Sequence, residues 1–273
     1  MKTARSVVLL AAVLAFAATA ARADWIPEDG HKMHYPQLPD PFGWDVKFDC
    51  ESQPPQILAD DWLCTDTGPV SDVHFWISMQ GDMDDNQGPG VAPPFQIQNL
   101  HLSIHRDVPA GQDPNPDVFW SHPGELIKAW DLLPDMFTVR WWDRGDQGWL
   151  DPVEGVVNPV DHINIYQVNV PRIPDPIRQE EGTIYWLDLC VDATVAAGNP
   201  VDLGWKTSMA PVFNDAAVFL GPDGNWYPLH DPQTQDIPLD LAFVITPEPA
   251  TLAFVGLGLA GIAAVRRRRC NHK

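Results

Sequence analysis

Proline is the residue that most limits what this chain can fold into. It occurs 28 times in 273 residues and falls between short apolar segments. Because proline lacks the backbone N–H of a helical residue and clashes with the preceding turn, its frequency argues against long helices. Between the prolines, apolar residues occupy the odd positions of 73–79 and the even positions of 100–105, which is the period of a strand. The pattern predicts an all-β fold, an antiparallel β-sandwich of jelly-roll type.

Most of the remaining segments also read as short strands separated by turn residues. Turn residues such as the run Gly221-Pro222-Asp223-Gly224 separate the expected strands. Residues 125–133 are expected to form two helical turns at most. Residues 24–55 show little periodicity and are expected to form an irregular arm, which leaves 56–246 for the sandwich domain. Further strands are expected at 137–142, 162–170, 183–191, 216–220 and 239–245.

The N-terminus has the three parts of a secretory signal peptide. Lys2 and Arg5 precede an uncharged, largely apolar run over 7–18, and Ala21-Arg22-Ala23 supplies an A-x-A cleavage site. A membrane anchor is the alternative, but the run is short of the roughly 20 residues that span a bilayer. We therefore expect 1–23 to be a signal peptide that is cleaved after Ala23.

The C-terminus carries a second membrane-directed segment, at 247–269. Pro247-Glu248-Pro249 is followed by an uncharged apolar stretch over 250–265 and then by Arg266-Arg267-Arg268-Arg269. An arginine cluster stays on the cytoplasmic side, so the stretch is expected to form a transmembrane helix with the protein body outside the inner membrane. A plain tail anchor after a proline-rich linker is the alternative.

These tail residues closely resemble the PEP-CTERM sorting signal of Gram-negative bacteria. The resemblance rests on three elements in the right order, which are Pro247-Glu248-Pro249, the apolar stretch and the arginines 266–269. It implies that a membrane enzyme, exosortase, recognises Pro247, Glu248 and Pro249. After transient residence in the inner membrane, the protein would pass to the cell envelope, cell surface or extracellular matrix.

A second resemblance covers most of 50–245. The stretches 57–64, 68–76, 204–208 and 239–245 look like those of an uncharacterised domain in PEP-CTERM proteins of planctomycete-type bacteria. The likeness implies a single β domain. That family has no established activity, so the likeness implies none for this chain.

Charge excludes one class of partner. Residues 24–249 hold nine Lys and Arg against 37 Asp and Glu, a net charge of −28. A nucleic acid would be repelled over nearly the whole surface, so we expect no nucleic-acid partner. An acidic surface instead favours solubility and cation binding.

Three cysteines lie in the exported part of the chain and allow one disulfide. Cys50 with Cys64 closes a short loop and is the predicted pair. Cys64 with Cys190 is the main alternative, and three buried free thiols are another.

One acidic loop has the residue types of a calcium site. Asp82, Asp84 and Asn86 place oxygen ligands at alternate positions, although the loop lacks the glycine and the final acid of an EF-hand. Calcium is the one cofactor that the sequence suggests. A solvated loop between strands, with no bound ion, is the alternative interpretation. His101, Ser103 and His105 share one face of a strand, where the two imidazoles are too far apart to chelate one ion.

The twelve tryptophans suggest a carbohydrate ligand. Trp141 and Trp142 are adjacent on an expected strand, so one ring should face inward and the other outward, where it can stack on a sugar. Core packing is the alternative role for most of these rings. No G-x-S-x-G, H-E-x-x-H or P-loop motif is present, and the acid pair Asp60 and Asp61 is adjacent on a strand.

The sequence thus predicts a non-enzymatic, exported cell-surface or matrix protein, with a polysaccharide or calcium as the candidate ligand. A secreted glycoside hydrolase, or another enzyme that acts on polysaccharide, is the competing hypothesis.

Overall fold

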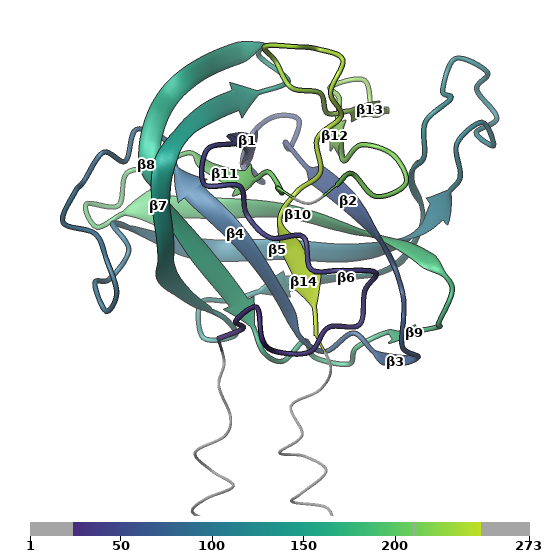
Figure 1. Ribbon diagram of the computed structural model, residues 1–273, viewed down its shortest axis with the longest axis horizontal. Coiled ribbons are helices and arrows are strands. Elements are labelled where there is room, and N and C mark those ends of the chain that lie inside the picture. The colour runs from purple at the N-terminus through teal and green to yellow at the C-terminus, as the bar shows by residue number, and fades with distance from the viewer. Residues whose placement is uncertain (1–23, 210, 247–273) are drawn as a thin grey trace, which may run out of the picture.

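The computed structural model of the chain describes residues 24–209 and 211–246. Every regular element in these residues is a β-strand, which confirms the all-β prediction (Figure 1). In the same part of the chain, no helix is long and apolar enough to cross a membrane. The predicted signal peptide, the predicted transmembrane helix and the tail residues 247–269 lie outside the described residues.

The first of two six-stranded sheets curls until it meets itself. Its order is β11-β1-β7-β8-β4-β14, and β11 pairs with β4 as well as with β1. The pairing of β1 with β7 is parallel, whereas all other pairs are antiparallel among the described strands. The strands are β1 (Trp44–Phe48), β4 (Val73–Met79), β7 (Thr138–Asp151), β8 (Val156–Val170), β11 (Leu203–Lys206) and β14 (Phe243–Ile245).

The second sheet has the order β13-β12-β2-β10-β5-β6, and a separate two-stranded sheet joins β3 (Gly68–Pro69) to β9 (Arg178–Gln179). Apolar residues of the two large sheets form one core cluster. The strands of the second sheet are β2 (Leu58–Leu63), β5 (Phe95–Val108), β6 (His122–Leu132), β10 (Ile184–Val195), β12 (Val218–Leu220) and β13 (Trp226–Pro228).

Aromatic rings connect the two sheets. Phe243 of β14 packs edge-on against Trp205 of the first sheet at 6.1 Å and against Trp62 of the second at 6.2 Å, measured between ring centroids. All three side chains are fully buried. A buried aromatic ring contributes a large apolar area, so this contact is a main support of the core.

The expected helical turns at 125–133 are wrong, because these residues belong to strand β6. Leu126, Ile127 and Trp130 have a spacing that a helix would also show. In the structure, β6 pairs with β5, and Trp130 and Leu132 alternate into the core opposite Leu102 and Leu100. Pairing with a long neighbouring strand therefore outweighs the local spacing.

The expected irregular arm at 24–55 is also only partly correct. Residues 44–48 form β1, which lies between β11 and β7 in the first sheet. Trp44, Val46 and Phe48 alternate into the core, a run too short to stand out in the sequence. Further upstream, the backbone N–H of Gln37 donates to Phe243 O at 3.1 Å, so this segment also belongs to the folded domain.

The predicted disulfide is wrong as well. Cys50 is bonded to Cys190 on β10, with 5.2 Å between their Cα atoms, and Cys64 is a buried free thiol. The reason is geometric, because strand β2 occupies 58–63 and separates Cys50 from Cys64 by about 20 Å. Cys190 follows Leu189, the partner of Leu58 at the start of β2, and so lies at the end of β2 nearer Cys50.

A network of charged side chains is buried in the first sheet. Lys206 Nζ and His162 Nε2 each lie 2.8 Å from Asp45 Oδ2, and His162 Nδ1 lies 3.1 Å from Asp161 Oδ1. Burial alone would raise the pKa of Asp45, but the two cations outweigh it and the net shift is downward. Burial lowers the pKa of His162, yet the two carboxylates raise it above its ordinary value. The network therefore joins Lys206 and His162 to the carboxylates of Asp45 and Asp161.

A second buried cluster contains acids that pair with no cation among residues 24–209 and 211–246. Gln37 Nε2 donates to Asp60 Oδ2 at 2.9 Å and to Asp240 Oδ2 at 3.3 Å. Burial raises the pKa of Asp60, and the nearby Asp240 and Asp61 raise it further. Burial raises the pKa of Asp240 to about 7. These carboxyls join the segment around Gln37 to β2 and to the chain that enters β14.

This cluster predicts a stability that falls as the pH rises. An acid with a raised pKa in the folded state binds its proton more tightly there, so its contribution is complete below pH 3.8 and disappears as the pH passes through about 7. Asp240→Asn should therefore stabilise the protein relative to the wild type at pH 8.5 more than at pH 6. Urea unfolding of residues 24–246 at both values measures this, with the exposed Asp236→Asn as the control. If the free energies of unfolding of Asp240→Asn and the wild type differ by the same amount at both pH values, the prediction is contradicted.

Candidate functional site

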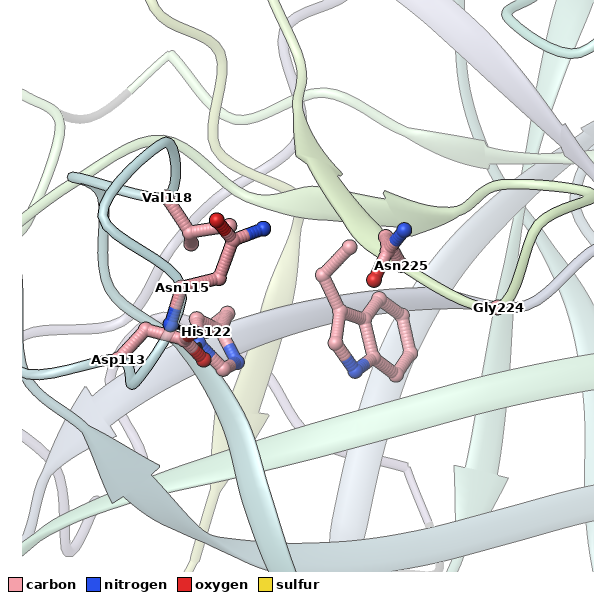
Figure 2. Close-up of a pocket in the computed structure, with 7 residues that line it drawn as sticks. Asp113, Asn115, Val118, His122, Gly224 and Asn225 are labelled. Atoms are coloured by element: carbon pink, nitrogen blue, oxygen red, sulfur yellow. Dashed lines mark hydrogen bonds and ion pairs between the residues drawn. The ribbon is translucent and has the colours of Figure 1, made fainter.

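A hollow opens between the β5–β6 loop, residues 109–121, and the turn that joins β12 to β13 (Figure 2). Asx turns shape the loop, since Asp113 Oδ1 accepts from Asn115 N at 2.6 Å and Asn115 Oδ1 accepts from Asp117 N at 3.1 Å. In the turn, Gly224 has a φ of 82°, a conformation that favours glycine. Local turn chemistry therefore fixes both rims of the hollow.

The hollow has a volume of about 230 Å³ and a mixed lining. Figure 2 shows the loop side chains on one side and Asn225 on the other. The residues that line it are Asp113, Asn115, Val118, His122, Gly224, Asn225 and Trp226. An apolar ring among several hydrogen-bonding groups is the usual composition of a small-molecule site.

His122 ties the loop to strand β6. Its Nε2 lies 2.9 Å from Asp113 Oδ2, and its Nδ1 lies 3.0 Å from the carbonyl oxygen of Pro123. Asn115 and Asn225 are solvent-exposed at the rims. Asn115 Oδ1 already accepts from Asp117 N, and Asn225 Nδ2 donates to Asp223 Oδ2 at 2.8 Å. Asn115 Nδ2 and Asn225 Oδ1 are therefore the amide atoms that a ligand can use, while the contact between His122 and Asp113 holds the loop in place.

The aromatic wall of the hollow rests on a second, smaller core on the outer face of the second sheet. Trp226 and Trp120 pack on a cluster formed by Ala59, Trp186 and Val218. Trp120 Nε1 also donates to the carbonyl oxygen of Trp226 at 3.1 Å. The half-buried ring of Trp226 is therefore held rigidly at the edge of the hollow.

Acids and amides near the hollow hold the loop to the sheet. Asn214 Nδ2 donates to Asp61 Oδ2 at 2.8 Å and to Ser121 Oγ at 3.1 Å, and Asp215 Oδ2 accepts from Ser121 N at 2.8 Å. Burial raises the pKa of Asp61 well above its ordinary value. Because Asp61 is fully buried, its carboxyl is placed to join β2 to the loop rather than to meet a ligand.

Ser103, His105 and Asp188 meet on the outer face of the second sheet. Ser103 Oγ lies 3.0 Å from His105 Nε2, and Asp188 Oδ2 also lies 3.0 Å from that atom. In a catalytic triad the acid binds Nδ1 instead. Here Nδ1 lies 3.0 Å from the carbonyl oxygen of Gly124. The arrangement therefore lacks the geometry that activates a serine.

Trp141 and Trp142 do not alternate as the strand pattern predicts. Both rings are partly buried and pack against the main core. A register shift between Trp141 and Asp143 interrupts the pairing of β7 with β8, which explains the loss of alternation. Trp141 Nε1 donates to Asn164 Oδ1 at 3.1 Å, and the Arg140 guanidinium lies 4.9 Å from the centre of the Trp142 ring. A glycan platform at these residues stays a prediction.

The predicted calcium ligands are occupied with other contacts. Asp82 is buried and its Oδ2 accepts from Tyr166 Oη at 2.7 Å. Asp84 Oδ1 accepts from the backbone and side chain of Asn86 at 2.9 and 2.8 Å. Over 24–209 and 211–246, no group of three or more His, Cys, Asp or Glu is placed to hold a metal ion. Calcium binding at Asp82, Asp84 and Asn86 stays a prediction.

Two family matches account for nearly the whole exported chain. Residues 33–246 match the family described as Domain of unknown function (DUF7901). The chain belongs to this family. Residues 246–269 match the PEP-CTERM protein-sorting motif, so both resemblances in the sequence are confirmed. Neither the curated proteins nor the solved structures contain a match.

The DUF7901 match agrees with the extent of the folded body. It begins at Met33, which is fully buried and bridges to Cys64, and it ends at Thr246 just after β14. The PEP-CTERM motif marks the protein as exported, anchored in the membrane before processing, and sorted by exosortase. The sorting residues Pro247, Glu248, Pro249 and the arginines 266–269 fall within this match.

Sequence reasoning missed the hollow. Its two walls are about a hundred residues apart in the chain, and only the fold of the second sheet brings them together. One local signal was present, since Trp226 follows the turn Gly221-Pro222-Asp223-Gly224 directly after Asn225. A tryptophan beside an exposed turn is a better platform candidate than a pair within a strand.

Proposed function

We propose that the DUF7901 domain of this protein is a non-enzymatic carbohydrate-binding module that exosortase sorting delivers to the cell surface or extracellular matrix. The observation that carries the proposal is the rigid, partly exposed ring of Trp226 beside the polar groups of Asn115, Asn225 and Asp113. A sugar presents an apolar face that stacks on an indole and hydroxyls that pair with amides and carboxylates.

The charge of the body narrows the ligand to an uncharged sugar. The acidic balance of 24–249 repels uronic acids and sulfated or phosphorylated glycans. The hollow itself includes the carboxylate of Asp113. Its volume of about 230 Å³ suits a single sugar ring at a chain end or within a chain rather than a buried oligosaccharide.

Trp226→Ala should weaken binding of the best neutral glycan about tenfold, as removal of a ring contact of about 1.4 kcal/mol would do. A neutral-glycan array followed by calorimetry on residues 24–246 measures the loss. Phe42→Ala is the control, because Phe42 is an exposed aromatic side chain that does not line the hollow. Equal loss in both variants, or no neutral ligand on the array, would contradict the proposal.

The same material tests the competing hydrolase hypothesis. Incubation of a bound polysaccharide with the protein should leave its chain length unchanged. If shorter products are released, and one Asp or Glu substitution abolishes their release, the domain is an enzyme rather than a binding module. In support of a binding role, Asp61, whose carboxyl is held by Asn214 and whose pKa burial raises, is fully buried.

A further inference from the structure

The folded body ends where the sorting motif begins. Thr246 is 4% exposed, and its backbone N–H donates to the carbonyl oxygen of Asp72 at 3.2 Å. The PEP-CTERM match starts at this same residue. The three residues from Pro247 to Pro249 span at most about 10 Å even when fully extended. An enzyme that binds these three residues must therefore come within about 10 Å of the folded body.

Strand β14 cannot offer itself to that enzyme, because both of its edges are already used. On one edge it pairs with β4, with Phe243 opposite Phe75 and Ile245 opposite Val73. On the other, Lys32 N donates to Ile245 O at 2.8 Å, and the Gln37 bond to Phe243 lies alongside. An enzyme that binds a substrate strand by backbone pairing needs a free edge. The processing enzyme can therefore bind as an extended strand only the residues that follow Thr246.

The N-terminal end of the body lies close to this exit. Val244, His74 and Asn169 form one row across β14, β4 and β8, and Trp25 N donates to Asn169 Oδ1 at 3.4 Å. The ring of Trp25 packs edge-on against Trp76 at 6.0 Å between centroids. Figure 1 shows the two ends of the described chain together, with β12 and β13 at the other end of the molecule.

Exposed residues surround the exit. The turn over 27–30 is exposed and is held by the bond from Trp25 Nε1 to Gly30 O at 3.3 Å, two residues before Lys32 meets Ile245. Arg172 is exposed and stands beside Ile173, whose N–H donates to Ser71 O at 2.8 Å, next to Asp72. We call residues 27–30 with Arg172 the exit face.

We propose that the exit face docks directly on the membrane-embedded enzyme that processes the tail. The proposal rests on processing of the PEP-CTERM tail and adds where the partner contacts the body. The absence of a spacer forces the two into contact, and the locked β14 fixes the orientation of the body. The hollow at Trp226 then faces away from the membrane during processing.

Site-specific photo-crosslinking in cells tests the contact. A photo-reactive residue replaces Arg172 or Glu28 in the full precursor, which is produced together with epitope-tagged exosortase. We expect adducts that carry the tag from both positions, and none from Pro222 in the β12–β13 turn. A photo-reactive residue in place of Ala250, within the tail, serves as the positive control.

A second arm separates docking from mere proximity. Insertion of ten Gly and Ser residues between Thr246 and Pro247 frees the body, so the Arg172 adduct should fall on the order of tenfold while the Ala250 adduct persists. Normal shortening of the precursor with an Ala250 adduct but none from the exit face would overturn the docking proposal. Equal adducts from Pro222 and Arg172 would overturn it too. A precursor that is never shortened would instead contradict processing itself.

Discussion

Replacement of Lys206 by methionine is expected to lower the free energy of unfolding by about 3–5 kcal/mol. Lys206 is fully buried and its Nζ lies 2.8 Å from Asp45 Oδ2 and 3.3 Å from the carbonyl oxygen of Trp44. Methionine keeps most of the apolar volume but removes the charge. Among the described residues, Asp45 Oδ2 then keeps only its contact with His162, while burial still opposes the charge of the carboxylate.

Urea unfolding at pH 7 measures the loss, and two variants calibrate it. Arg106→Met removes a cation of the same charge from an exposed pair with Glu125 and should cost less than about 1 kcal/mol. Lys206→Met combined with Asp45→Leu removes both members of the buried pair and should recover part of the loss. The structure indicates that the buried network stabilises the fold. A loss of unfolding free energy in Lys206→Met no larger than that in Arg106→Met would contradict this.

The strands that could be predicted are those whose pattern is local. Residues 73–79 alternate over their full length and form β4 with the predicted bounds. Strand β1 has only three apolar positions, and it exists because β11 and β7 supply backbone partners from residues 138–206. Strand β6 likewise depends on β5. Pairing across such distances leaves no mark in a short window of sequence, so local pattern finds some strands and misses others.

The candidate site was harder to predict for the same reason. Tryptophan abundance pointed to carbohydrate, but the strand pair Trp141 and Trp142 proved to be packed on the core. The half-buried ring proposed as a platform, Trp226, depends on a loop that starts more than a hundred residues earlier and on the small core around Trp186. Composition could suggest a carbohydrate as the ligand to propose, whereas the position of the candidate site required the fold.

Loss of the disulfide is the second large effect that we expect. Cys190→Ser should lower the free energy of unfolding by about 4 kcal/mol, because the bond closes a loop of 140 residues and limits the unfolded chain. Cys64→Ala is the control, since Cys64 is buried but unbonded, and it should cost less than half as much.

Peptide mapping of the oxidised protein decides the pairing that underlies this expectation. The short loop between Cys50 and Cys64 made that pair attractive, yet strand β2 runs between the two residues and keeps them near its opposite ends. Cys190 reaches Cys50 because β10 lies beside β2 in antiparallel register. A peptide that links Cys50 to Cys190, with one thiol reactive only after unfolding, is therefore expected. A Cys50–Cys64 peptide would be incompatible with strand β2 and with the second sheet as described.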